Sequence, residues 1–170
     1  MVVLTPLSSW LKNQPQHIVA VQKTRPVTTQ DFLSRVQDWI NVLHDQQTSR
    51  CAVFHSDAFE FLAILFALWQ LKCTACIPGD NRPGTVQRLE THVDSFAGEF
   101  ADGITASDSG SSHHTDKKQW FSLPPDFIAL EIYTSGSTGE PKPITKTISQ
   151  LEREIAVLES LWPSRQECVV

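Results

Sequence analysis

The chain has 170 residues, of which 41% are hydrophobic and 19% charged, and its formal net charge is −5 at pH 7. This composition is typical of a globular domain, and the acidic balance argues against a nucleic-acid-binding protein, which usually carries a basic patch. The longest apolar run, Phe61 to Trp69, is far shorter than the about 20 residues of a membrane span, and the N-terminus does not resemble a signal peptide. We therefore expect a cytoplasmic protein with no membrane span and no nucleic-acid partner.

Short apolar runs alternate with helical patterns along the chain. The predicted strands cover residues 17–21, 51–55, 73–77, 103–105 and 127–133, with a further strand opening at 167–170. The predicted helices cover residues 28–43, 57–71, 84–98 and 148–162. Because strands that alternate with helices are typical of βαβ units, the sequence predicts an α/β fold with a largely parallel sheet flanked by helices.

Polar residues mark the starts of three predicted helices. Thr28 or Thr29 suits the N-cap of the first, and Asp57 and Thr147 each precede a glutamate or glutamine by three residues, the spacing of a capping box. The helix over 57–71 is apolar nearly all round, which predicts that it is buried. The last helix carries an apolar stripe at helical spacing, formed by Ile148, Leu151, Ile155, Leu158 and Trp162.

Cys73 and Cys76 have the C-x-x-C spacing of zinc and redox sites. No second C-x-x-C or histidine pair follows at ligand spacing, so we expect two small buried residues, since free cysteine is among the most buried residue types. The adjacent His113 and His114 lie in the polar run 106–119, which we interpret as a mobile surface loop with solvated histidines. The sequence therefore predicts no metal site.

The most specific segment is YTSGSTGEPK, from Tyr133 to Lys142, directly after a predicted strand. Successive backbone N–H groups in a glycine-permitted turn form an anion-binding concavity, and Gly136 and Gly139 allow the backbone to approach a ligand closely. Hydroxyl groups add donors and Lys142 adds a positive charge suited to phosphate. The predicted binding residues are Thr134, Ser135, Gly136, Ser137, Thr138, Gly139 and Lys142.

Two other interpretations of this segment fit less well. A Walker-type loop requires G-x-x-x-x-G-K-[ST], but here Glu140 and Pro141 precede the lysine, and Pro143 stands where a metal-binding hydroxyl should follow. A flexible linker has a similar Ser/Gly composition, but a predicted strand precedes this segment and a predicted helix begins at Ile148. A phosphate-binding loop accounts for both the composition and the setting.

The pattern Y-T-S-G-S-T-G-x-P-K closely resembles the phosphate loop of the adenylate-forming (AMP-binding) superfamily, which includes acyl-CoA synthetases, peptide-synthetase adenylation domains and luciferases. The resemblance covers residues 17–170, although only the loop is sharply specific, and residues 55–61 are similar to the family's N-S-x-E-F helix start. Two positions depart from the family pattern. Pro143 replaces the usual glycine and removes one N–H, and Cys73 or a neighbour replaces a glycine before the third strand.

This resemblance implies a fold and a reaction. The fold would be the partial N-terminal subdomain of the adenylate-forming enzymes. In the reaction, a carboxylic acid and ATP, with Mg²⁺ in the complete enzyme, give an acyl-adenylate and pyrophosphate, and the acyl group then passes to CoA or an acyl carrier protein. In the loop, Thr134, Ser135, Ser137 and Thr138 would donate hydrogen bonds to the β- and γ-phosphates, Gly136 and Gly139 would give backbone freedom, and Lys142 would neutralise the departing pyrophosphate.

The family's other motifs lie downstream of the phosphate loop, and none is visible in this chain. We therefore expect residues 1–170 to be the N-terminal portion of an AMP-binding domain, incomplete at the C-terminus. We expect such a piece to have no catalytic residue of its own and to be inactive alone. Its partner would be the remainder of the enzyme, an acyl-CoA-synthetase-like ligase of fatty acid metabolism. The alternatives are a non-catalytic interaction or regulatory module that retains the subfold, and a different nucleotide-binding enzyme.

Overall fold

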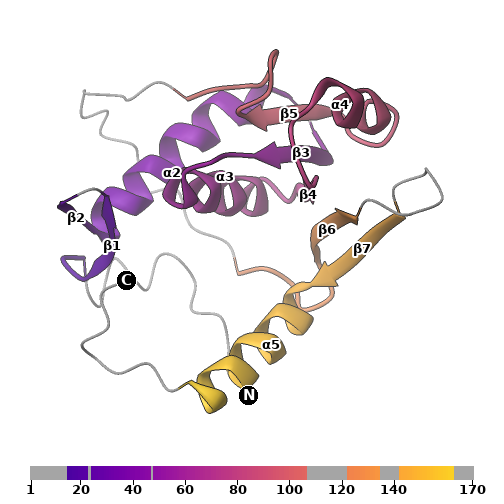
Figure 1. Cartoon of the computed structure of the whole chain (residues 1–170). Coiled ribbons are helices and arrows are strands. Elements are labelled where there is room, and N and C mark those ends of the chain that lie inside the picture. The colour runs from indigo at the N-terminus through magenta and orange to yellow at the C-terminus, as the bar shows by residue number, and fades with distance from the viewer. Residues whose placement is uncertain (1–14, 23, 47, 107–121, 135–141, 163–170) are drawn as a thin grey trace.

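The computed structural model describes residues 15–22, 24–46, 48–106, 122–134 and 142–162 (Figure 1). The strands are β1 (Ile18–Gln22), β2 (Arg25–Thr28), β3 (Arg50–Phe54), β4 (Thr74–Ile77), β5 (Ser95–Gly98), β6 (Ile128–Thr134) and β7 (Lys142–Thr147). The helices are α2 (Thr29–Leu43), the 3₁₀ helix η1 (His44–Gln46), α3 (Ala58–Gln70), α4 (Pro83–Leu89) and α5 (Ile148–Leu161).

Five strands form the main sheet, in the order β5-β3-β4-β6-β7. The pairs β5–β3, β3–β4 and β4–β6 are parallel. The edge strand β7 pairs antiparallel with β6. The ribbon β1–β2 stands apart from this sheet and leads directly into α2 (Figure 1). These strands confirm the predicted α/β fold with a largely parallel sheet flanked by helices.

The parallel strand β3 is covered on both faces, as is usual in a parallel sheet. On one face α2 and α3 cover a large apolar cluster that includes Cys51 and Val53 of β3. On the other face Ala52 belongs to a smaller cluster with Leu89 of α4 and Tyr133 of β6. The alternation along β3 follows the two-residue period of a strand, so neighbouring side chains enter different clusters.

The helix starts follow the predicted caps with one exception. Thr28 forms a full capping box with the side chain of Asp31, and Thr147 forms one with a glutamine three residues later. Asp57 accepts hydrogen bonds from the backbone N–H groups of residues 59 and 60, but the predicted reciprocal bond, from the Asp57 N–H to the Glu60 carboxylate, is wrong. The Glu60 carboxylate instead accepts from Arg35 Nε (2.8 Å) and Trp39 Nε1 (2.9 Å), and the bond from the arginine is a strong, charge-assisted one.

The predicted helix over 84–98 is wrong in its second half. The helix α4 ends at Leu89, and residues 95–98 form β5, which pairs parallel with β3. The Asp94 carboxylate accepts hydrogen bonds from the backbone N–H groups of Ser49 and Arg50, each at 2.9 Å, and fixes this register. The predicted strand over 103–105 is reduced to a single bridge between Ala97 and Ile104. Sheet pairing with a distant segment therefore overrides the local helical spacing.

Besides β5, the strands β2 and β7 were not predicted from the sequence. Residues 25–28, between the first predicted strand and the first predicted helix, form β2, and residues 142–147, between the predicted loop and the last predicted helix, form β7. The second was obscured by Pro143, which suits only an edge strand. The edge position of β7 explains how the proline is tolerated.

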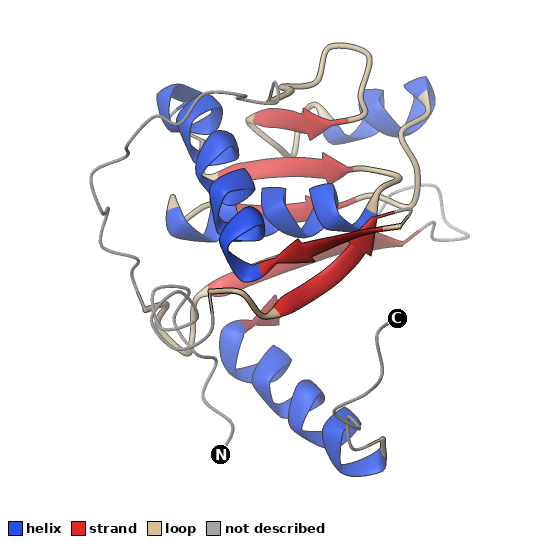
Figure 2. Cartoon of the chain, turned by 90° about the vertical axis from the view of Figure 1, so that its left-hand side faces the viewer, coloured by secondary structure: helices blue, strands red, loops and turns tan. Residues whose placement is uncertain are grey.

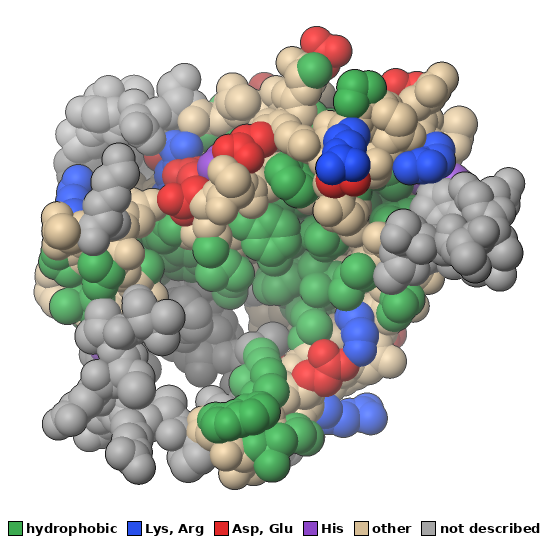
Figure 3. Space-filling view, in the orientation of Figure 1, with side chains coloured by type: hydrophobic (Ala, Val, Ile, Leu, Met, Phe, Trp, Pro, Cys, Tyr) green, Lys and Arg blue, Asp and Glu red, His purple; other side chains and the backbone are tan. Residues whose placement is uncertain are grey.

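The last helix, α5, projects away from the sheet (Figures 1 and 2). Its predicted apolar stripe is buried only at its first turn: Ile148 is 3% exposed, whereas Leu158 is 52% and Trp162 70% exposed. Figure 3 shows hydrophobic side chains on the surface of this part of the molecule. None of the helices in the described ranges is both long enough and apolar enough to cross a membrane.

Candidate functional site

The predicted phosphate loop is the connection of a β-hairpin. The strands β6 and β7 pair antiparallel up to the register Tyr133–Pro143 and Thr134–Lys142, so the two ends of the loop lie side by side. The predicted residues Ser135, Gly136, Ser137, Thr138 and Gly139 lie outside the described residues. Of Thr134 and Lys142, the structure describes the backbone. The structure therefore places the backbone of the loop's first and last residues. The phosphate-binding roles of the loop's hydroxyl and glycine residues stay a prediction.

The hairpin ends at the carboxyl edge of the parallel strands. Ile132 of β6 lies opposite Ile77, the last residue of β4, so Thr134 extends just beyond the end of the neighbouring strand. In open α/β sheets, ligands bind in the crevice outside the carboxyl ends of the strands. The position of the hairpin agrees with that rule.

The connections after β3, β4 and β5 meet at this same edge. The Glu99 carboxylate accepts hydrogen bonds from the backbone N–H and the hydroxyl of Ser56, at 2.9 and 2.7 Å. These bonds lower the pKa of Glu99. The pKa of Asp80 is lowered by hydrogen bonds from the Thr85 hydroxyl and the backbone N–H of Arg82. At this edge, the ionised carboxylates of Glu99 and Asp80 thus hold the turns that follow β3 and β4.

A polar cluster lies next to the start of the predicted loop, and we call it the Arg50 cluster: the buried Cys76, Glu131 and Tyr133 together with the partly exposed Arg50. Arg50 Nη2 donates to the Tyr133 hydroxyl at 2.8 Å and makes a close ion pair with the Glu131 carboxylate. The Tyr133 hydroxyl also lies 3.3 Å from Glu131 Oε2, and the Cys76 thiol lies 3.6 Å from the same oxygen. Three neighbouring strands therefore contribute to one polar contact.

Sequence reasoning missed Arg50 and Glu131. The available signal was a charged residue in an otherwise apolar strand, because glutamate is almost never buried unless it is paired. Glu131 is 9% exposed, and its partner comes from a strand 81 residues earlier in the chain. Spacing along the sequence therefore does not identify that partner.

The low polarity around the Arg50 cluster keeps its weak acids protonated. Burial raises the pKa of Tyr133 to about 12, and the nearby Cys76 adds to that rise. Burial likewise raises the pKa of the Cys76 thiol to about 12. At neutral pH, Tyr133 is therefore a neutral hydroxyl that can donate to Glu131 while it accepts from Arg50.

Tyr133 is the chain's single tyrosine, so its ionisation can be measured directly. We expect almost no phenolate absorbance in the folded chain at pH 10.5, because the pKa of Tyr133 is about 12. In concentrated guanidinium chloride at the same pH, roughly three quarters of the phenol should be ionised, as for an exposed tyrosine. The stabilisation from this shift is complete below about pH 10 and is lost as the pH rises through 12. A folded midpoint near 10 would contradict this expectation.

The C-x-x-C pair behaves as the sequence predicts. Cys73 and Cys76 are free thiols, each at most 1% exposed, and burial raises the pKa of both. In the described part of the chain, no group of three or more His, Cys, Asp or Glu residues could hold a metal ion. The prediction that these cysteines are small buried residues is confirmed.

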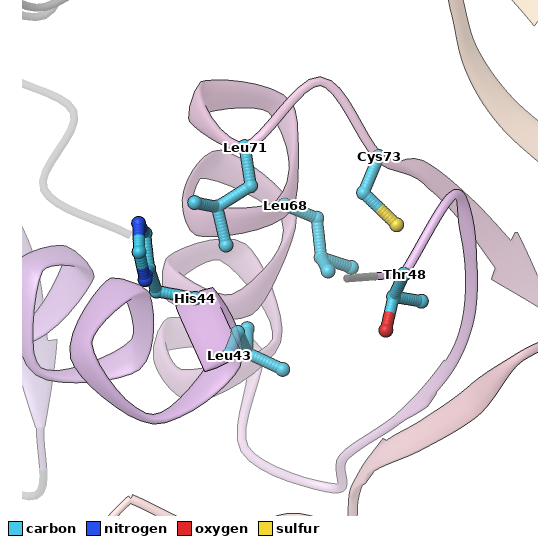
Figure 4. A pocket seen from close by; sticks show the side chains of 6 residues that line it. All are labelled: Leu43, His44, Thr48, Leu68, Leu71 and Cys73. Atoms are coloured by element: carbon cyan, nitrogen blue, oxygen red, sulfur yellow. The ribbon is translucent and has the colours of Figure 1, made fainter. Parts of the chain in front are cut away.

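A separate cavity of about 310 Å³ lies at the opposite edge of the sheet, where α2 and α3 end and β4 begins (Figure 4). Its lining consists of Leu43, His44, Thr48, Leu68, Leu71 and Cys73. Cys73 is the only one of these that sequence reasoning considered as a site residue. Neither Thr134 nor Lys142, the two ends of the predicted loop, is among these lining residues.

A comparison with solved structures shows many similar folds. The chain is similar to o-succinylbenzoate CoA synthetase (MenE) from Bacillus subtilis in complex with AMP, with a TM-score of 0.77 and 16% identity over 95% of this chain and 47% of that one. It is similar to the same enzyme in complex with ATP and magnesium ion, with a TM-score of 0.74 and 14% identity over 95% and 48% of the two chains. It also matches the NpsA N-terminal subdomain from Klebsiella oxytoca in complex with 3-hydroxyanthranilyl-AMSN, with a TM-score of 0.67 and 16% identity over 89% and 41%.

These matches establish the class of fold. The chain has the fold of the N-terminal part of adenylate-forming enzymes, as the sequence resemblance implies. It spans less than half the length of each of these solved chains. No protein-family model matches the sequence, and no curated protein matches it either.

Proposed function

We propose that this chain is the N-terminal portion of an ATP-dependent acid–thiol ligase, whose predicted loop binds the phosphates of ATP. The observation that carries the proposal is the pairing of Thr134 with Lys142, which closes YTSGSTGEPK into one connection at the carboxyl edge of the sheet. The fold supports it, because the similar enzyme from Bacillus subtilis was solved with AMP and with ATP and magnesium ion.

The reaction would proceed in two steps. A carboxylate oxygen of the acid attacks the α-phosphorus of ATP, the bond to the β-phosphate oxygen breaks, and an acyl-adenylate and pyrophosphate form. The sulfur of CoA or of a carrier protein then attacks the acyl carbon and AMP leaves. A fatty or aryl acid is the substrate class that we propose.

The loop's part in the first step is electrostatic. Backbone N–H groups and the hydroxyls of Thr134, Ser135, Ser137 and Thr138 would hold the β- and γ-phosphates, and Lys142 would stabilise the charge that develops on pyrophosphate. Mg²⁺ supplies further charge neutralisation when it is bound with ATP.

The proposal predicts that the chain binds MgATP by itself. We expect saturable binding in titration calorimetry, with shifts of the amide signals of residues 135–139. Replacing both Gly136 and Gly139 with valine should abolish it, because side chains there obstruct the close approach of a phosphate. The exposed Gly84→Ala change in α4 is the matched control, since a Cβ there meets nothing within 4 Å. Absence of saturable binding by the parent chain would overturn the assignment of the loop.

The same proposal implies that the chain does not catalyse adenylation alone. Activation of the acid depends on several elements that position and stabilise the reacting groups together. Exchange of labelled pyrophosphate into ATP, dependent on an added acid, would contradict this part of the proposal.

A non-catalytic interaction module is the second candidate function. The observation that favours it is the exposure of three apolar residues, Leu158 and Leu161 of α5 and Trp162 at its C-cap. The MgATP titration separates the two candidates, because an interaction module has no need of a competent phosphate loop.

A further inference from the structure

We propose that the Arg50 cluster is a positioning device for the phosphate-binding loop, with Arg50 and Glu131 as positioning residues that act through Tyr133. This inference rests on the proposed function, since that function gives the loop its ligand. Neither Arg50 nor Glu131 belongs to the loop motif, and both act from within the sheet.

The geometry directs the cluster at the residue that precedes the loop. Arg50 begins β3, and its side chain extends past β4 to β6, where Nη2 contacts both Glu131 and the Tyr133 hydroxyl. Cys76 of β4 lies in register with Glu131, so its small side chain leaves room for this contact. Thr134, the first of the predicted phosphate-binding residues, follows Tyr133 directly, so the cluster holds the residue that precedes them.

Stability alone does not account for such a cluster. The Glu131 side chain is 12% exposed and that of Arg50 is 38% exposed, so the carboxylate loses most of its hydration. In addition, Arg50 Nε is buried without a hydrogen-bond partner among the described residues. Replacing a buried ion pair by apolar residues is often neutral or stabilising, and polar groups that persist in such places can specify one arrangement of the chain.

We infer that these groups fix the position of the last residues of β6, from which the predicted loop begins. Tyr133 is 5% exposed, and its ring lies 6.2 Å from the ring of His92 beyond the end of α4. Packing alone would hold an aromatic ring in this space. The hydrogen bonds of the Tyr133 hydroxyl to Arg50 and Glu131 also fix the position of the ring along the direction of the strand. Binding sites whose groups are held within a fraction of an ångström depend on such supporting contacts.

The test uses a paired apolar replacement, Arg50→Met with Glu131→Leu. Arg50→Met alone would leave the Glu131 carboxylate buried without its cation and could unfold the chain. The double variant removes both charges together and should keep the melting temperature within about 4 °C of the parent. Tyr133→Phe is the second variant, since it removes only the hydroxyl. Arg88→Met, at an exposed position of α4, is the matched control.

Two measurements are made on each variant: amide hydrogen exchange at residues 133, 134 and 142, and the dissociation constant for MgATP. For the double variant we expect exchange at these amides to accelerate about tenfold, exchange in the β3–β5 pair to be unchanged, and MgATP affinity to fall about tenfold. Tyr133→Phe should produce smaller changes of the same kind, and Arg88→Met none.

Three results overturn the proposal. Exchange at residues 133, 134 and 142 that stays within about twofold of the parent shows that the cluster does not fix the strand end. Accelerated exchange throughout the sheet shows that the cluster stabilises the whole fold and not the hairpin end in particular. Accelerated exchange at the hairpin with unchanged MgATP affinity shows that the loop does not depend on it. Failure of the parent chain to bind MgATP instead overturns the proposed function, and with it the loop's ligand, while the exchange data still decide whether the cluster fixes β6.

Discussion

Replacement of Gly98 by alanine is expected to lower the free energy of unfolding by at least about 3 kcal/mol. Gly98 ends β5 with a φ of +95°, a conformation that side chains other than glycine's rarely adopt. A Cβ at this position would lie 2.3 Å from the carbonyl oxygen of Phe54, the residue that pairs with Gly98 on β3. That oxygen also accepts the backbone N–H of Glu99 at 2.8 Å, so it cannot move without loss of pairing.

Urea unfolding followed by circular dichroism measures this effect. Gly79→Ala and Gly84→Ala are matched controls, because neither glycine has a positive φ and a Cβ at either meets nothing within 4 Å. In the helix α4, alanine should be neutral or stabilising by up to about 1 kcal/mol. A similar loss in all three variants would show that the β3–β5 contact is not the cause.

Lys142→Ala in the complete enzyme is expected to slow formation of the acyl-adenylate by about 100-fold or more. In the proposed function, the lysine's charge acts on pyrophosphate as it leaves, which occurs only in the first half-reaction. Formation of the thioester from pre-made adenylate should therefore change little. Single-turnover assays of the two half-reactions measure these rates separately.

Lys146→Ala is the matched control for this prediction. Lys146 lies on the same strand, but its ammonium group pairs with Glu154 of α5. We expect that change to leave both half-reactions close to the parent rates. Equal losses in the two half-reactions of the Lys142 variant would count against a role at the departing pyrophosphate.

Much of the fold can be predicted from the sequence, because its local signals agree with the tertiary structure. Apolar strands, helical stripes and N-cap residues such as Thr28 and Asp57 predict β3, α2 and α3 nearly to the residue. The segment Tyr133 to Lys142 was also visible, since its glycines, hydroxyls and lysine are adjacent in the chain. The structure places its two ends side by side, and the roles of its residues stay a prediction.

The errors arose where distant residues decide the structure. Residues 95–98 have helical spacing with α4, but hydrogen bonds to β3 turn them into a strand. The β7 strand is formed by pairing with β6, despite a proline that argues against a strand. The apolar stripe of α5 follows the helical period, yet only its first turn packs against the sheet. Periodicity identifies an apolar face, but it does not say what covers that face.

The sequence by itself thus determined much of the alternation of strands and helices and predicted a phosphate loop at Tyr133 to Lys142, because these depend on residues close together in the chain. Only the tertiary structure decided that the loop closes a hairpin at the carboxyl edge, and that Arg50 reaches Glu131 and Tyr133 beneath it. The partners in that cluster are more than 80 residues apart, at separations of 81 and 83. They meet because a parallel sheet places β3, β4 and β6 side by side, and no local pattern records that order.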